Sequence, residues 1–195
     1  MEPRKQLTSI DRIAFGPEPV MPDFRGLTSP DGAITLMLSD IAEAASVEAS
    51  VGPERWEQLL RDHHALVERV IESRGGQVAR FERDGFFASF NSALAGLHAA
   101  VQLQRDFTSI APDPTVTLRI GLHSGFVIAA PEEPQGRNAV LAARIAGEAK
   151  AGEILVSSSL KQYTERDPRF TFEPHGEHHF RGLVGEHTVY SVRWG

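Results

Sequence analysis

No cysteine occurs in this chain of 195 residues. Disulfide bonds, thiolate metal sites and a cysteine nucleophile are therefore excluded. Long apolar runs are also missing, since none approaches the roughly 20 residues that span a bilayer. The first residues, Met1–Lys5, are not followed by the apolar stretch of a signal peptide. We therefore expect a cytoplasmic protein with no membrane partner.

Basic residues are fewer than acidic ones. The chain has 20 lysines and arginines and 26 aspartates and glutamates, which gives a formal net charge of −6. This charge argues against a nucleic-acid partner, which would favour a basic face. An α+β RNA-binding domain is further disfavoured because the expected strands carry no aromatic stacking motif. The contents of hydrophobic residues, 41%, and of charged residues, 24%, are ordinary for a globular domain. If such an acidic chain handles a polyphosphate, it must rely on a few placed cations and metal ions.

Periodicity and turn signals predict one α+β domain at residues 31–195, after an extended arm or linker at residues 1–30 that contains five prolines. A helix is expected where apolar residues from Trp56 to Ile71 recur at three and four. The expected helices are 53–74, 92–107 and 137–149, and the expected strands are 33–41, the arms of a hairpin at 77–90, two runs within 115–130 broken at Ser124-Gly125, 153–157, and runs near 170–174 and 187–193. This order predicts helices covering a mixed sheet.

Two aspartates, Asp40 and Asp84, each lie at the end of a strand-like run. Asp84-Gly85 has the composition of a hairpin tip. If the second arm of this hairpin pairs antiparallel with the strand at 33–41, it begins where that strand ends, and the two aspartates become neighbours. Two carboxylates so placed can hold one or two hard divalent cations such as Mg²⁺. Taken singly, each aspartate is also an ordinary turn residue.

Residues 33–194 resemble the catalytic domain of the class III nucleotidyl cyclases, the adenylyl and guanylyl cyclase family. The resemblance implies a ferredoxin-like βαββαβ core with a mixed, largely antiparallel sheet covered by helices. It rests on Leu38–Ile41, on Asp84-Gly85, on Arg119–Gly125, on Gly136 followed by Ala142–Ile145, on Gly152–Ser157 and on Phe180–Leu183.

The resemblance implies that two Mg²⁺ or Mn²⁺ ions sit on Asp40 and Asp84, with the backbone carbonyl of Ile41 as a further metal contact. The ribose 3′-hydroxyl of a nucleoside triphosphate then attacks the α-phosphate and diphosphate leaves. Arg144 matches the arginine that stabilises charge on the phosphates, and Arg181 falls where the family has a triphosphate-binding lysine. The resemblance also implies that composite active sites form in a head-to-tail homodimer.

The positions that select the base keep their charges but change their residues. Arg80 falls at the base-selecting lysine of adenylyl cyclases, and Glu133 falls at the base-selecting aspartate. An arginine presents a planar fork where a lysine presents a point charge. The base preference is therefore open among ATP, GTP and a pyrimidine triphosphate.

Three departures bear on catalysis. Val140 stands where the family has a ribose-orienting asparagine, and Asn138 is expected to point elsewhere on the helix. Glu43-Ala44 replaces a Gly-Phe pair in the phosphate-binding turn, and Arg83 replaces a glycine before the second metal aspartate.

These residues leave two hypotheses for the function. The first is an active nucleotide cyclase, favoured by the retained charged residues. The alternative is a degenerate cyclase-fold module that binds a nucleotide or a protein without chemistry, favoured by Val140 and Glu43.

Overall fold

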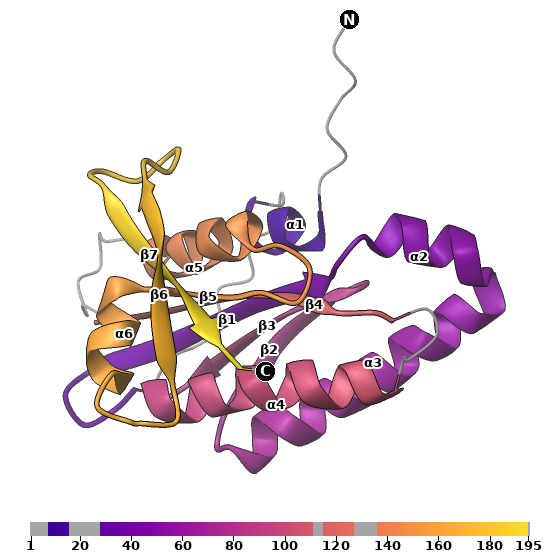
Figure 1. Ribbon diagram of the computed structural model, residues 1–195, viewed down its shortest axis with the longest axis horizontal. Helices are drawn as coiled ribbons and strands as arrows, with labels where there is room; N and C mark the ends of the chain where they lie inside the picture. Colours follow the sequence, from indigo (N-terminus) through magenta and orange to yellow (C-terminus); the bar gives the residue numbers. More distant parts are fainter. Residues whose placement is uncertain (1–7, 16–27, 111–114, 127–135, 195) are drawn as a thin grey trace, which may run out of the picture.

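The computed structural model describes residues 8–15, 28–110, 115–126 and 136–194 (Figure 1). A seven-stranded sheet in the order β2-β3-β1-β4-β5-β7-β6 forms its centre. The strands are β1 (Ala33–Ile41), β2 (Gln77–Glu82), β3 (Gly85–Phe90), β4 (Leu118–Phe126), β5 (Ile154–Ser157), β6 (Thr171–His178) and β7 (His187–Arg193). The helices are α1 (Ser9–Phe15), α2 (Ala44–Val51), α3 (Pro53–Ser73), α4 (Ala93–Ile110), α5 (Gly136–Glu148) and α6 (Ser158–Thr164).

The first four strands with α3 and α4 form the expected βαββαβ core. β1 pairs antiparallel with both β3 and β4, and β2 pairs antiparallel with β3. β4 and β5 are parallel, with α5 as the crossover between them, while β7 pairs antiparallel with β5 and with β6. The predicted α+β class and the mixed, largely antiparallel sheet are therefore confirmed. None of the helices formed by the described residues is long and apolar enough to cross a bilayer.

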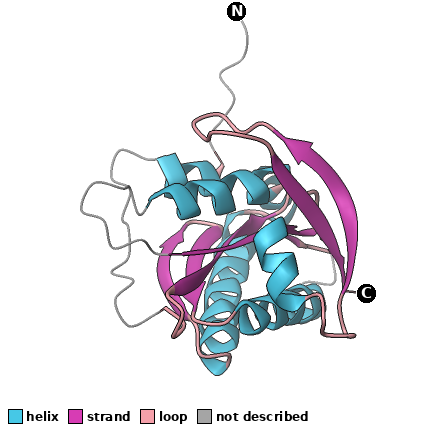
Figure 2. Cartoon of the chain, turned by 90° about the vertical axis from the view of Figure 1, so that its left-hand side faces the viewer, coloured by secondary structure: helices cyan, strands magenta, loops and turns pink. Residues whose placement is uncertain are grey.

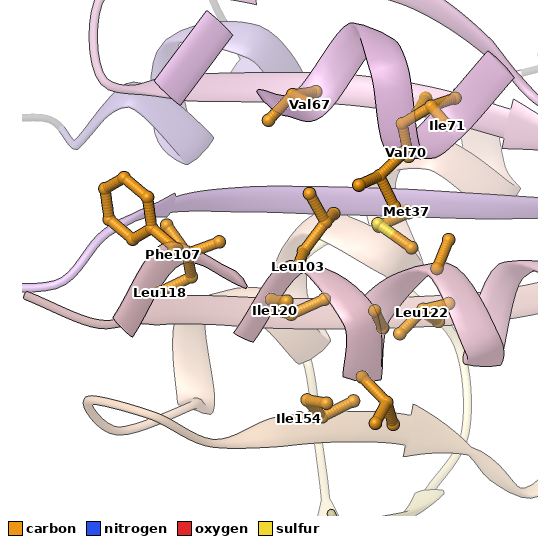
Figure 3. Close-up of a cluster of buried hydrophobic side chains, with 14 of the residues drawn as sticks. Met37, Val67, Val70, Ile71, Leu103, Phe107, Leu118, Ile120, Leu122 and Ile154 are labelled. Atoms are coloured by element: carbon orange, nitrogen blue, oxygen red, sulfur yellow. The ribbon is translucent and has the colours of Figure 1, made fainter. Parts of the chain in front are cut away.

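Every residue of β1 is buried, because helices cover both faces of the sheet (Figure 2). Side chains alternate between faces along a strand, so Met37 and Ile41 point to one face of the sheet while Leu36, Leu38 and Asp40 point to the other. On the first face, α3 and α4 supply Val67, Ile71 and Leu103 to the largest core cluster (Figure 3). The expected helix at 53–74 and its apolar stripe are confirmed.

The opposite face carries α5 and the short helix α1 (Figure 1). Alanines of α5 pack on Leu36 and Leu38, and the two isoleucines of α1, Ile10 and Ile13, pack beside them near Phe87. Asp40 is on this face, as part of the same alternation as Leu36 and Leu38. Both helices therefore border the end of the sheet where the two aspartates lie.

Several expected elements differ from the observed ones. Residues 9–15, expected to be extended, form α1, whose start is capped by reciprocal hydrogen bonds between Thr8 and Asp11. α2 was not expected. β4 runs through Ser124-Gly125 without the expected break, because both residues pair with β1. The second expected run of this pair continues beyond residue 126, outside the described residues. The proposed boundary at residue 30 stays a prediction.

One polar side chain lies in the core between α3 and the sheet. His63 is fully buried against Phe86 and Phe107, and neither of its ring nitrogens has a hydrogen-bond partner among the described residues. Burial lowers the pKa of His63 to about 3, so the ring is neutral in the folded protein. A buried polar group without a partner costs about 1–3 kcal/mol.

We expect His63→Leu to raise the free energy of unfolding by about 1–2 kcal/mol, or the Tm by about 3–6 °C, because leucine fills the space without unpaired nitrogens. The pKa of His63 is lower in the folded chain than in the unfolded chain. Protonation of the unfolded chain therefore lowers the free energy of unfolding of the wild type as the pH falls below about 6.5. The advantage of the variant should therefore widen by about 1.4 kcal/mol per pH unit between pH 6 and 4. Denaturant unfolding at several pH values measures both effects.

The matched control is His64→Leu on the same helix. His64 is hydrogen bonded through Nε2 to the carbonyl of Arg83 at 2.8 Å, so its replacement should lower stability or leave it unchanged. A His63→Leu variant that is less stable than the wild type at neutral pH would show that the ring nitrogens are satisfied in solution.

Candidate active site

Asp40 and Asp84 are brought together by the pairing of β1 with β3, as the sequence predicts. Asp40 is the register partner of Gly85, and the amide of Ile41 donates a hydrogen bond to the carbonyl of Asp84 at 3.1 Å. The hairpin of β2 and β3 therefore places Asp84 at its tip, beside the end of β1. Two acidic side chains separated by more than forty residues in sequence thus share one edge of the sheet.

A third charged residue, Arg119, completes this cluster. It is the register partner of Asp40 on β4, and its Nε and Nη2 donate to the two carboxylate oxygens of Asp40 at 2.8 and 2.5 Å. Burial raises the pKa of Asp40 to about 6, and Arg119 offsets only part of that effect. The nearby charge of Asp84 adds to the rise. Arg119 has no assigned role in the sequence-based prediction, because the register of β4 on β1 cannot be read from the sequence.

The tip of the hairpin is fixed by three contacts. Ser9 of α1 donates its hydroxyl to Oδ1 of Asp84 at 2.6 Å. Arg83 adopts a left-handed backbone with φ of 53°, which costs a non-glycine residue on the order of 1 kcal/mol, and its carbonyl binds His64. Gly85 has no room for a β-carbon, which would stand 2.8 Å from the Ser9 β-carbon and 2.9 Å from the carbonyl of Ser39.

A cavity of about 620 Å³ opens at this cluster. Asp40, Asp84 and Arg119 line it, together with the turn that follows β1. In that turn Glu43 has φ of 54°, the conformation that glycine adopts most easily. Other cationic side chains also line the cavity, and they are Arg12, Arg83 and Lys150. The combination of a carboxylate pair and several cations suits a metal-bound polyphosphate.

The donor atoms at this cluster are of the kind that Mg²⁺ or Mn²⁺ prefers. Two carboxylates, and the backbone carbonyl of Ile41 next to them, supply only oxygen ligands. Among residues 8–15, 28–110, 115–126 and 136–194 there is no group of three or more acidic or histidine side chains that could hold a metal ion. A divalent ion here would therefore need further oxygens from substrate phosphates and water, and Arg119 would have to release the oxygens of Asp40.

Arg144 and Val140 lie one turn apart on α5, both half-buried. Nη2 of Arg144 donates to the carbonyl of Arg181 at 3.2 Å, which brings these two predicted phosphate ligands together. Arg181 is exposed in the loop between β6 and β7. β7 is three strands from β1 in the sheet, or about 14 Å at the usual spacing. The structure therefore groups the predicted site residues into a carboxylate cluster and an arginine cluster.

α5 packs unusually close to the sheet. A β-carbon at Gly121 of β4 would stand 2.3 Å from the amide nitrogen of Ala146. At the start of α5, Asn138 is hydrogen bonded to His123 Nε2 at 3.2 Å and donates to the carbonyl of Phe126 at 3.1 Å. Asn138 thus anchors the helix to β4.

The two predicted base-selecting residues have different outcomes. Arg80 pairs in register with Phe87 on β3, so it lies on the same face of the sheet as Asp40. Its guanidinium forms an ion pair with Glu82 at 2.8 Å. Glu133 lies outside the described residues. Neither role is tested by these contacts, and both stay predictions.

The fold and the order of motifs match known proteins. A family model described as the adenylate and guanylate cyclase catalytic domain matches residues 28–193. An uncharacterised protein of Mycobacterium tuberculosis is 32% identical over 131 residues, which make up 67% of this chain and 44% of that protein. The chain therefore spans less than half the length of this relative.

Two solved structures share the architecture. The adenylyl cyclase CyaB from P. aeruginosa superposes with a TM-score of 0.73 at 18% identity, covering 83% of this chain and 93% of that chain. The guanylyl cyclase Cya2 superposes with a TM-score of 0.70 at 20% identity, covering 82% and 91%. At these identities the likeness shows the fold. The family match, which extends over all but the ends of the sequence, shows that this chain belongs to the adenylate and guanylate cyclase catalytic domain family.

Proposed function

We propose that the protein is a nucleotide cyclase that converts a nucleoside triphosphate to a 3′,5′-cyclic nucleotide and diphosphate. The observation that carries this proposal is the meeting of Asp40, Asp84 and Arg119 at one cavity, within a chain of the cyclase family. Asp40 and Asp84 would hold the divalent ions, with the carbonyl of Ile41. The ions would neutralise charge on the phosphates and lower the barrier to attack.

The residues of the chain have separate tasks in this scheme. Arg119, released from Asp40, is placed to bind a phosphate oxygen in the same cavity. Arg144 and Arg181 supply further positive charge from a second copy of the chain, and Arg80 and Glu133 contact the base. The ribose 3′-hydroxyl loses its proton to water and its oxygen forms a bond to the α-phosphorus. The bond from that phosphorus to the β-phosphate oxygen breaks, and diphosphate leaves.

The direct test is incubation of the protein with ATP, GTP, CTP or UTP, each with Mn²⁺, followed by mass detection of cyclic products. We expect one cyclic product to dominate, since Arg80 presents a planar donor pair to the base. Asp62→Asn, which alters an exposed aspartate on α3, is the matched control and should keep full activity. Absence of every cyclic product from a folded, dimeric protein would favour the module that binds a nucleotide or a protein without chemistry.

Val140 is expected to limit the rate. The side chain of valine can neither donate a hydrogen bond to the ribose nor accept one from it. The 3′-oxygen is therefore less firmly aligned with the α-phosphate than it would be with an asparagine at this position. Loss of one placed polar contact costs on the order of 10²–10³-fold in rate. Val140→Asn should raise kcat at least about tenfold and change KM less, because the contact acts mainly in the transition state. Steady-state kinetics with Mn²⁺ measure the effect.

Val140→Thr is the control for this variant, since it keeps the branched shape and adds only a short hydroxyl. We expect it to leave kcat within a fewfold of the wild type. An unchanged kcat for Val140→Asn, against a measurable wild-type rate, would mean that another group holds the ribose.

A further inference from the structure

The short helix α1 covers part of the sheet face that carries Asp40. Ile10 and Ile13 are 1% and 5% exposed, and they pack in the cluster that contains Leu38 and Phe87. α1 contacts β1, β2, β3 and α5. Among the described residues, α1 is the cover of the apolar side chains of β1, β2 and β3 beside α5, since α5 itself covers the β4 side of this face.

The same helix also engages the carboxylate cluster. The hydroxyl of Ser9 binds Oδ1 of Asp84, while Arg119 binds both oxygens of Asp40. At least three of the four carboxylate oxygens therefore have donors among the residues that the structure describes. Ser9 also stands directly over Gly85, at a distance that leaves no room for a β-carbon. Thr8, Ser9 and Arg12 thus line the cavity beside the hairpin.

In the proposed shared site, the arginine cluster of a second copy needs access to this same side. Arg144 and Arg181 are bound to each other near β7, three strands from β1. They are not among the side chains that line the cavity of Asp40 and Asp84 in the part of the chain that the structure describes. A second copy that brought its arginines to the carboxylates across β1 and β3 would meet α1, since Thr8, Ser9 and Arg12 line the cavity.

We propose that α1 occupies the surface on which a second copy of this chain docks, so that the helix must leave before two chains can assemble a complete site. The inference rests on the proposed function, because only a site shared by two chains requires this surface to be open. The length of α1 suits such a role. A helix of seven residues is not stable alone, so it is held by its docking contacts and can unfold on release.

The first experiment follows hydrogen exchange of the wild-type chain at concentrations that span monomer and dimer, fixed by sedimentation velocity. The amides of residues 10–15 should lose their protection as the dimer forms, while those of α3 keep theirs. Protection of α1 that stays constant or increases in the dimer would overturn the inference, since it would make the helix a bystander or a part of the interface.

The second experiment weakens the contact of α1 with the sheet. Ile13→Asp should lower the dimer dissociation constant about tenfold or more, and the milder Ile13→Ala should shift it in the same direction by a smaller factor. Ile110→Asp makes the same change at an exposed isoleucine on α4 and should leave the constant unchanged. If both Ile13 variants associate no more tightly than the wild type, the inference is wrong.

These measurements separate the inference from the proposed function because they need no turnover. If the Ile13 variants dimerise more tightly and α1 loses protection, but no triphosphate is cyclised, the proposed function fails and the competition between α1 and the second chain stands. If the wild type forms a cyclic product and α1 remains docked in the dimer, the function stands and this inference fails.

Discussion

Asp84→Asn is expected to abolish metal-dependent turnover, by at least about 10³-fold, and to leave the fold intact. The variant keeps the size of the side chain and removes the charge that would balance a divalent ion beside the phosphates. Asp84 is only half-buried at a hairpin tip, so an amide can be hydrated there. Initial rates in Mn²⁺ and in Mg²⁺, with Mn²⁺ binding by calorimetry, measure the loss.

Asp40→Asn should be equally inactive but also less stable, by about 1–3 kcal/mol, because Arg119 would lose the carboxylate that accepts two of its hydrogen bonds. Comparison of the two variants separates the metal role from the structural role. A near-normal rate for Asp84→Asn in either metal would remove this residue from the site.

Mixing two inactive variants is expected to restore activity if each site is shared by two chains. An Asp84→Asn chain keeps Arg144, and an Arg144→Ala chain keeps Asp84. In an equal mixture half of the dimers contain one chain of each kind, and each of these carries one intact site of two. The expected recovery is therefore about a quarter of the wild-type rate.

The control for this mixture pairs Asp40→Asn with Asp84→Asn. Both carboxylates of a site come from one chain, so no combination of these two variants contains an intact site and no recovery is expected. Recovery in the control as well, or no recovery in the first mixture despite measured exchange of chains, would contradict the shared site.

The sequence was sufficient for the core of the fold because local signals and periodicity agree there. The pairing of Asp40 with the hairpin tip followed from one assumption, that the second arm lies antiparallel beside the strand at 33–41. The role of Arg119 was not predicted because its contact with Asp40 depends on the register between two long strands, which no local signal fixes. The same uncertainty produced the mistaken break at Ser124-Gly125.

The helix α1 carried a signal that the prolines around it obscured. Thr8 and Asp11 have the spacing of a capping box, which marks the start of a helix. Its docking on the sheet could not be foreseen, because a segment of seven residues has too few apolar positions to define a partner. The contact of Ser9 with Asp84 depends entirely on that docking.

Glu43 and Arg83, which stand where the family has glycine, both have the left-handed backbone that favours glycine.

The close packing of α5 on Gly121 leaves the helix little room to shift relative to the sheet. A β-carbon there would overlap the helix backbone, and interiors this dense do not deform gradually. The backbone of Arg144 is therefore held at a set distance from the carboxylates of its own chain, and the geometry of the proposed shared site depends on the angle between the two subunits. A rotation of a few degrees moves a side chain far from the axis by about 1 Å, enough to cost on the order of 10²-fold in rate. If the proposed shared site is correct, its rate depends on how the two subunits are aligned, and any domain or partner that changes this angle changes the rate.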